Sequence, residues 1–289
     1  MKTFAAPQVG RIITEPGSSP SKPAVAIALH CSGSSGRQWS ALRMSLRLQV
    51  FTPDLMGCGA MPHLADYRPF RLADEARSIV ALINELEAPV HLIGHSYGGA
   101  VALRISVERP NRIASLTLYE PTTFYVLKVC GDAGDAALKE IRDLAEEIDE
   151  QIAAGSYRRA ACRFVDYWNG PRTFDSLSQD AQKKVIRYVP KVCREFRVLI
   201  GERTPLLAYR KLRIPLLIMC GEHAPTSTQL IARKLATIMN PGSLRIIAGA
   251  GHMGPITHSD VVIQNTIARI DGSDPAGVSN TASWTRQAA

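Results

Sequence analysis

Short apolar runs that alternate with longer amphipathic segments are the feature that most limits how this chain can fold. Each run is three to six residues long and ends at a glycine, a proline or a polar loop. Runs of this length, bounded in this way, indicate strands that are buried on both faces. They occupy residues 24–29, 50–52, 90–93, 115–119, 215–220 and 244–248.

The amphipathic segments between these runs predict helices. Their apolar residues recur every three or four positions, which is the period of a helix with one buried face. Strand–helix–strand alternation implies an α/β fold with a mostly parallel, doubly wound sheet and helices on both of its faces. In such sheets the chemistry lies on loops at the carboxyl ends of the strands. The clearest helical segments are 72–86, 97–108 and 226–239.

The alternation stops between residues 122 and 213, where we find only helical patterns. About 90 residues of helix between two strands is too long for an ordinary crossover. We therefore predict an inserted helical cap at 122–213, on an α/β core formed by 1–121 and 214–271. The last segment, 272–289, is rich in Ser, Ala, Gly and Thr without periodicity, which predicts a flexible tail.

Composition and charge argue against several classes of function. Hydrophobic residues make up 46% of the 289 residues, as in an ordinary globular protein. The net charge of +8 is spread along the chain, so we expect no nucleic-acid partner. There is no C-x-x-C pair and no H-E-x-x-H motif, so we expect no metal site. No apolar run is long enough for a membrane span or a signal peptide, which predicts a cytoplasmic protein with no membrane partner.

The strongest chemical signal is Gly-His-Ser-Tyr-Gly-Gly at 94–99, between a predicted strand and a predicted helix. A serine in this G-x-S-x-G context sits on a tight turn, with its hydroxyl above the edge of the sheet. The glycines are needed because the strand and the helix cross closely there. The turn also aims the first amide groups of the helix at the reacting centre, where negative charge develops. Ser96 is therefore the candidate nucleophile.

Together with three further motifs, this turn makes the chain resemble an α/β-hydrolase with a helical cap. Asp-Leu-Met-Gly-Cys-Gly at 54–59 is similar to the family's D-L-x-G-x-G turn, and His-Cys-Ser-Gly at 30–33 stands where the family has its oxyanion loop. Gly-Ala-Gly-His-Met at 249–253 resembles the turn that carries the catalytic histidine. The motifs occur in the family's order, and the resemblance covers about residues 22–270.

The resemblance also implies the oxyanion hole. It assigns the two donors to the backbone N–H groups of Ser32 and Tyr97. Cys31 stands where the family usually has glycine, and we expect its side chain to narrow the hole. Cys31 could itself be considered as a nucleophile, but nothing in its sequence context supplies a base.

A serine hydroxyl is a poor nucleophile unless an imidazole takes its proton. His252 is favoured because it lies in a Gly-rich loop after the last strand and completes the order Ser…acid…His. His95, inside the serine turn, is expected to be structural or to line the pocket. Ala224 occupies the family's usual aspartate position, which leaves two glutamates as the acid. Glu120 ends the strand before the cap and is our first choice, and Glu222, after the next strand, is the second.

These residues predict a serine hydrolase that cleaves carboxylic esters through an acyl-enzyme, with no cofactor and with a small-molecule ester as its substrate. C–C bond hydrolysis and cofactor-free perhydrolysis are alternatives that use the same triad on capped members of the family. A non-catalytic ligand-binding protein is a third hypothesis, because a fold does not fix function. Aromatic residues of the cap are candidate pocket residues, although aromatics at helical spacing are more often core: Phe124, Tyr125, Tyr157, Phe164, Tyr167, Trp168 and Tyr188.

Overall fold

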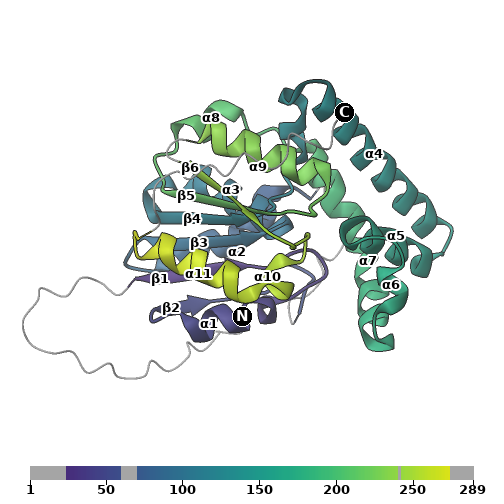
Figure 1. The fold of residues 1–289 in the computed structure, drawn as a ribbon, viewed down its shortest axis with the longest axis horizontal. Coiled ribbons are helices and arrows are strands. Elements are labelled where there is room, and N and C mark those ends of the chain that lie inside the picture. The colour runs from purple at the N-terminus through teal and green to yellow at the C-terminus, as the bar shows by residue number, and fades with distance from the viewer. Residues whose placement is uncertain (1–23, 60–69, 240–241, 274–289) are drawn as a thin grey trace, which may run out of the picture.

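The centre of the structure is a parallel sheet with the strand order β2-β1-β3-β4-β5-β6 (Figure 1). The computed structural model describes residues 24–59, 70–239 and 242–273. All six predicted strands are present, and the predicted doubly wound α/β class is confirmed. The strands are β1 (Val25–Leu29), β2 (Gln49–Phe51), β3 (Val90–His95), β4 (Ile113–Tyr119), β5 (Leu216–Gly221) and β6 (Gly242–Ile247).

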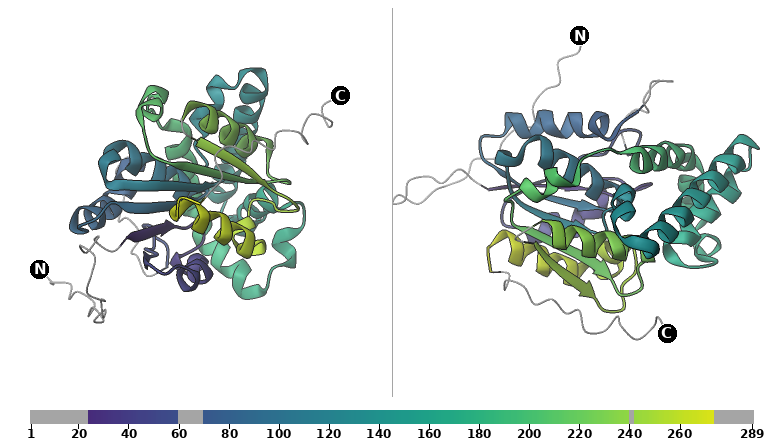
Figure 2. Two further views of the ribbon diagram at one scale, coloured as in Figure 1. Left: turned by 60° about the vertical axis from the view of Figure 1, so that its left-hand side comes forward. Right: turned by 90° about the horizontal axis from the view of Figure 1, so that it is seen from above.

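Helices connect the strands and cover both faces of the sheet (Figures 1 and 2). They are α1 (Ser40–Ser45), α2 (Leu72–Glu85), α3 (Tyr97–Glu108), α4 (Gly131–Ala153), α5 (Tyr157–Asn169), α6 (Thr173–Ser176), α7 (Gln179–Gly201), α8 (Leu206–Lys211), α9 (Thr226–Ile238), α10 (Gly254–Thr257) and α11 (Ser259–Ile270). Short 3-10 helices occupy Gly36–Trp39, Pro110–Arg112 and Phe124–Val129.

Strand β1 illustrates how the sheet divides the core into two layers. Its side chains alternate between the faces, as the pleat of a strand requires. Ala26 and Ala28 belong to the apolar cluster with α1 and α11. Ile27 and Leu29 belong to the larger cluster on the other face, with α2, α3 and α9. Because all four side chains are fully buried, burial on both faces explains the unbroken apolar run in the sequence.

Residues 122–213 contain helices and no strand. Helices α4 to α7, which we call the cap helices, lie beyond one end of the sheet (Figures 1 and 2). Aromatic rings tie them to the segment that follows β4. The ring of Phe124 stacks on Phe196, with centroids 5.8 Å apart, and on Trp168, with centroids 6.5 Å apart. The division into a core and a cap domain at 122 and 213 stays a prediction.

Four short helices, α1, α6, α8 and α10, were not predicted. Each has four to six residues, which is too short for a helical period to appear in the sequence. The predicted tail lies outside the described residues from 274 onward. Within the described ranges, no helix combines the length and the apolar character needed to cross a bilayer.

Candidate active site

Ser96 occupies the turn between β3 and α3, with a φ of 54° and a ψ of −117°. The backbone comes so close there that side chains have no room beside it. A Cβ at Gly94 would lie 2.6 Å from the carbonyl oxygen of Gly98. A Cβ at Gly98 would lie 2.5 Å from the carbonyl oxygens of Leu29 and His30. A non-glycine residue at positive φ is strained, and strain of this kind gathers at functional sites.

Ser96, His252 and Glu120 form a continuous hydrogen-bonded chain. The distance from Ser96 Oγ to His252 Nε2 is 2.9 Å, and that from His252 Nδ1 to Glu120 Oε2 is 2.7 Å. All three side chains are buried. With the proton on Nδ1 donated to the carboxylate, Nε2 is free to accept the serine proton. Three residues from the carboxyl ends of three strands are thus arranged for nucleophilic attack.

The structure brings Glu120, and not Glu222, to the imidazole. Glu120 follows β4 and has a φ of 43°, so it too is in the strained left-handed region. Its Oε1 accepts a hydrogen bond from the amide of Gly221 at 2.9 Å, and its Oε2 accepts another from the Thr228 hydroxyl at 3.0 Å. Glu222 is exposed, and its carboxylate accepts a hydrogen bond from the amide of Gly249. Hydrogen bonds from Gly221, Thr228 and the imidazole therefore fix the position of the Glu120 carboxyl group beside His252.

The loop that carries His252 is held by the residues that precede Ser96 and Glu120. The hydroxyl of Tyr119 donates to the Gly251 carbonyl at 2.8 Å, and His95 Nε2 donates to the His252 carbonyl at 2.8 Å. His95 Nδ1 accepts from the Gln38 side chain at 2.9 Å. Burial, followed by the proximity of His252, holds the pKa of His95 well below its usual value. His95 is therefore neutral, and it positions the loop rather than lining the cavity.

The two amides predicted as oxyanion donors lie in different segments, that of Ser32 in the loop after β1 and that of Tyr97 at the start of α3. Cys31 to Ser34 form a turn with Gly33 at a φ of 70°, and the amide of Cys31 donates to the Gln38 side chain at 3.1 Å. Ser32, the next residue, lines the cavity. Tyr97 is the first residue of α3, so its amide has no acceptor within the helix. Burial raises the pKa of the Cys31 thiol to about 12, so this thiol stays protonated and is a poor nucleophile.

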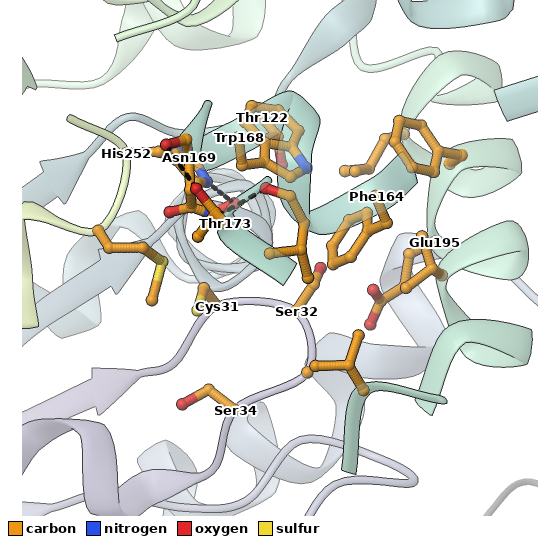
Figure 3. A pocket seen from close by; sticks show the side chains of 18 of the residues that line it. Cys31, Ser32, Ser34, Thr122, Phe164, Trp168, Asn169, Thr173, Glu195 and His252 are labelled. Carbon is orange, nitrogen blue, oxygen red and sulfur yellow. Dashed lines mark hydrogen bonds between the residues drawn. The ribbon is translucent and has the colours of Figure 1, made fainter. Parts of the chain in front are cut away.

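A cavity of about 260 Å³ lies between the triad and the cap helices (Figure 3). The indole of Trp168 stacks on the His252 imidazole, with centroids 4.2 Å apart and an angle of 25° between the planes. Phe124 and Phe164 also line the cavity, whereas the other four candidate aromatics are not among its lining residues. The cavity wall is thus mostly apolar, and its polar side chains come from Ser32, Ser34, Thr122, Asn169, Thr173 and Glu195. The remaining apolar lining residues include Val165, Leu177, Val185, Val192, Phe196, Leu199 and Met253.

Sequence reasoning missed several polar residues of this region, among them Gln38 and Glu195. Gln38 links the loop after β1 to His95, and Glu195 of α7 reaches the cavity wall. Neither lies in a motif. Gln38 contacts His95, 57 residues away, and the place of Glu195 at the cavity depends on how α7 packs, so no local pattern could identify them. Among the described residues, no group of three or more His, Cys, Asp or Glu side chains is arranged to hold a metal ion.

Comparison with known proteins identifies the family to which this fold belongs. The Alpha/beta hydrolase family model matches residues 26–265. The chain belongs to the alpha/beta hydrolase family. This α/β hydrolase is 36% identical to lipase LipV of Mycobacterium tuberculosis over 104 residues, which are 35% of this chain and 39% of LipV. The match to this curated relative therefore spans well under half of its length.

Solved structures with the same fold cover nearly the whole chain. An α/β hydrolase enzyme from a Medee basin deep-sea metagenome library has a TM-score of 0.72 at 13% identity, over 88% of this chain and 92% of that one. A thermophilic esterase from Thermogutta terrifontis has a TM-score of 0.62 at 20% identity, over 88% and 91% of the two chains. At these identities the likeness concerns the fold.

Proposed function

We propose that this α/β hydrolase cleaves carboxylic esters through an acyl-enzyme formed on Ser96. The observation that carries the proposal is the chain of two short hydrogen bonds, 2.9 Å and 2.7 Å, from Ser96 through His252 to Glu120. A nucleophile, a base and an orienting acid in this order are the elements that acyl transfer requires. The similarity to a lipase and the shared fold with an esterase support the same reaction class.

The reaction follows from the roles of these groups. His252 Nε2 takes the hydroxyl proton as Ser96 Oγ attacks the ester carbonyl. The amides of Ser32 and Tyr97 hold the oxyanion. The Glu120 carboxylate stabilises the imidazolium, which then protonates the leaving alcohol. Water, activated by the same imidazole, attacks the acyl carbon and releases the acid and the free serine.

The cavity favours an ester with a small or medium-sized acyl group. Its volume of about 260 Å³ lies slightly below the range of typical drug-sized ligand sites. Aromatic and aliphatic side chains of the cap helices form most of its wall. Such a wall binds a short hydrocarbon chain by burial, at about 0.8 kcal/mol for each methylene group.

Labelling with a fluorophosphonate tests the proposal. The wild-type protein should be labelled and should hydrolyse p-nitrophenyl acetate or butyrate, and Ser96→Ala should do neither. Ser106→Ala is the matched control, because Ser106 is a buried serine of α3 whose hydroxyl donates to a carbonyl of the same helix. This variant should be labelled like the wild type.

The same labelling, combined with rate measurements on vinylogous diketones and in the presence of peroxide, distinguishes the alternatives. A C–C bond hydrolase would be labelled but would prefer vinylogous diketones to esters, and a perhydrolase would need peroxide to reach its full rate. A non-catalytic binding protein would be neither labelled nor active. An unlabelled wild-type protein without esterase activity would therefore refute the assignment of Ser96 as a nucleophile.

A further inference from the structure

A buried carboxylate in the cavity wall has one oxygen without a partner. Glu195 of α7 is 2% exposed and lines the cavity. Its Oε1 accepts a hydrogen bond from the Tyr188 hydroxyl and lies 3.0 Å from Lys191 Nζ. Its Oε2 is buried with no hydrogen-bond partner among the described residues. In Figure 3 the carboxylate turns towards the cavity from the side opposite His252.

Lys191 holds this carboxylate through Oε1, the oxygen other than the unpartnered Oε2. Its ammonium group lies between Glu195 and Glu75, 3.6 Å from Glu75 Oε2. Glu75 also accepts hydrogen bonds from the Tyr97 hydroxyl at 2.8 Å and from the amide of Met56 at 2.6 Å. Burial alone would lower the pKa of Lys191, but the two carboxylates outweigh it and raise that pKa above its usual value. Lys191 thus stays charged and links Glu195 to Glu75 of α2, which in turn binds the hydroxyl of Tyr97, the first residue of α3.

In the absence of a ligand, the unpartnered Oε2 of Glu195 lowers the stability of the folded protein. A buried polar atom without a partner destabilises the folded state, and more so when the group is charged. An apolar residue at this point of α7 would continue the surrounding wall without that cost. A polar atom that converges on a mostly apolar cavity is the usual means of selecting a ligand. The open oxygen therefore indicates a hydrogen-bond donor on the bound molecule.

The charge around Glu195 indicates which kind of donor. Lys191 Nζ lies 3.0 Å from Oε1 of Glu195, so an ammonium group of the substrate bound at Oε2 of the same carboxylate would lie close to a like charge and be repelled by it. A substrate carboxylate would meet Glu195 itself, and no lysine or arginine is among the described residues that line the cavity. A hydroxyl group can donate a hydrogen bond to Oε2 and carries no charge, so neither Lys191 nor Glu195 repels it.

We propose that Glu195 determines substrate specificity by accepting, at Oε2, a hydrogen bond from a hydroxyl group of the ester, away from the carbonyl that Ser96 attacks. The inference rests on the proposed esterase function, because it concerns the substrate of the same cavity. The preferred substrates are then hydroxylated esters rather than plain alkyl esters or esters that carry a carboxylate. A site built to pair a hydroxyl group discriminates against analogues that lack it.

Matched p-nitrophenyl esters test this inference. The 3-hydroxybutanoate, 6-hydroxyhexanoate and 8-hydroxyoctanoate esters are each compared with the unsubstituted and the methoxy ester of the same length. The readout is the ratio of kcat/KM for the hydroxylated ester to that for its unsubstituted counterpart, at the chain length where the ratio is largest. In Glu195→Leu this ratio should fall about 10- to 100-fold, the effect of losing a hydrogen bond to a charged group. The rate on hydroxylated esters should fall while the rate on unsubstituted esters rises, a crossing that general damage to the fold would not produce.

Two further variants complete the experiment. Glu195→Gln keeps the shape of the side chain and should give a ratio between those of the wild type and Glu195→Leu, so it serves if the leucine variant does not fold. Tyr188→Phe removes a donor to Oε1 but leaves the carboxylate, and it should keep the hydroxyl preference. If the wild type hydrolyses all three ester types with equal kcat/KM, or if the ratio is unchanged in both Glu195 variants, the specificity role is overturned while the esterase function stands. An unlabelled wild type that hydrolyses none of the esters overturns both.

Discussion

Replacing Glu120 with glutamine puts an NH₂ group, itself a donor, where the carboxylate now accepts hydrogen bonds from three donors. The carboxylate accepts from the Gly221 amide through Oε1, and from His252 Nδ1 and the Thr228 hydroxyl through Oε2. Glutamine has one oxygen and one NH₂ group in their place. If its oxygen faces Gly221, its NH₂ group faces the imidazole and forces Nδ1 to become an acceptor. The proton then sits on Nε2, and the imidazole can no longer take the serine proton.

The opposite orientation of the glutamine is no better. Its oxygen would then serve His252, but its NH₂ group would face the amide N–H of Gly221 and leave a buried donor unpaired, at a cost of about 1–3 kcal/mol. We therefore expect Glu120→Gln to hold the wrong tautomer. Loss of the correct tautomer lowers kcat about 10⁴-fold in triads of this kind, which corresponds to about 5.5 kcal/mol of transition-state stabilisation.

The assay is steady-state hydrolysis of p-nitrophenyl butyrate, with circular dichroism to confirm that the variant is folded. Glu222→Gln is the matched control, because its carboxylate is exposed and accepts from the Gly249 amide. It should keep kcat within about twofold, as surface substitutions usually have small effects. The reasoning fails if Glu120→Gln keeps more than a tenth of the wild-type kcat, or if Glu222→Gln loses as much.

Three other perturbations are expected to have measurable effects. Gly98→Ala would place a Cβ 2.5 Å from backbone oxygens and should lower the free energy of unfolding in urea by about 1–3 kcal/mol, whereas Gly201→Ala, with open space around it, should not. Trp168→Ala removes the ring stacked on His252 and should lower kcat/KM about tenfold, with most of the rate restored in Trp168→Phe. His95 stays neutral when folded but gains a proton below about pH 6.5 when unfolded, so stability is retained above that pH and lost below it. From pH 7.5 to 5.5 the wild type should lose about 1.4 kcal/mol more of its free energy of unfolding than His95→Gln, and equal losses would contradict a buried neutral histidine.

Local sequence signals were sufficient for the sheet and for the nucleophile turn. The strands are recognisable because burial on both faces leaves unbroken apolar runs between glycines and prolines. The serine turn is recognisable because the close approach of backbones at Gly94 and Gly98 admits only glycine. Both signals arise within a few residues, so no knowledge of distant contacts is needed to detect them.

The remaining parts of the site depend on which strands are neighbours. The choice between Glu120 and Glu222 could be argued from position but not decided, because both follow strands at the same end of the sheet. Only the three-dimensional arrangement brings Thr228 and Gly221 around Glu120 and turns Glu222 towards Gly249. Contacts between residues that lie about 100 positions apart in the chain, such as Glu120 with Gly221 and Thr228, produce no periodic pattern in the sequence.

The position of the histidine loop has a consequence for how the protein loses activity. His252 follows β6, which is hydrogen-bonded to β5 alone at the outer edge of the described sheet. Outer strands open at lower free energy than central ones, and they do so while the rest of the chain stays folded. Fraying of β6 would withdraw the base from a nucleophile that remains in place on β3. Thermal inactivation is therefore expected to report the local opening of one outer strand before the melting of the whole molecule.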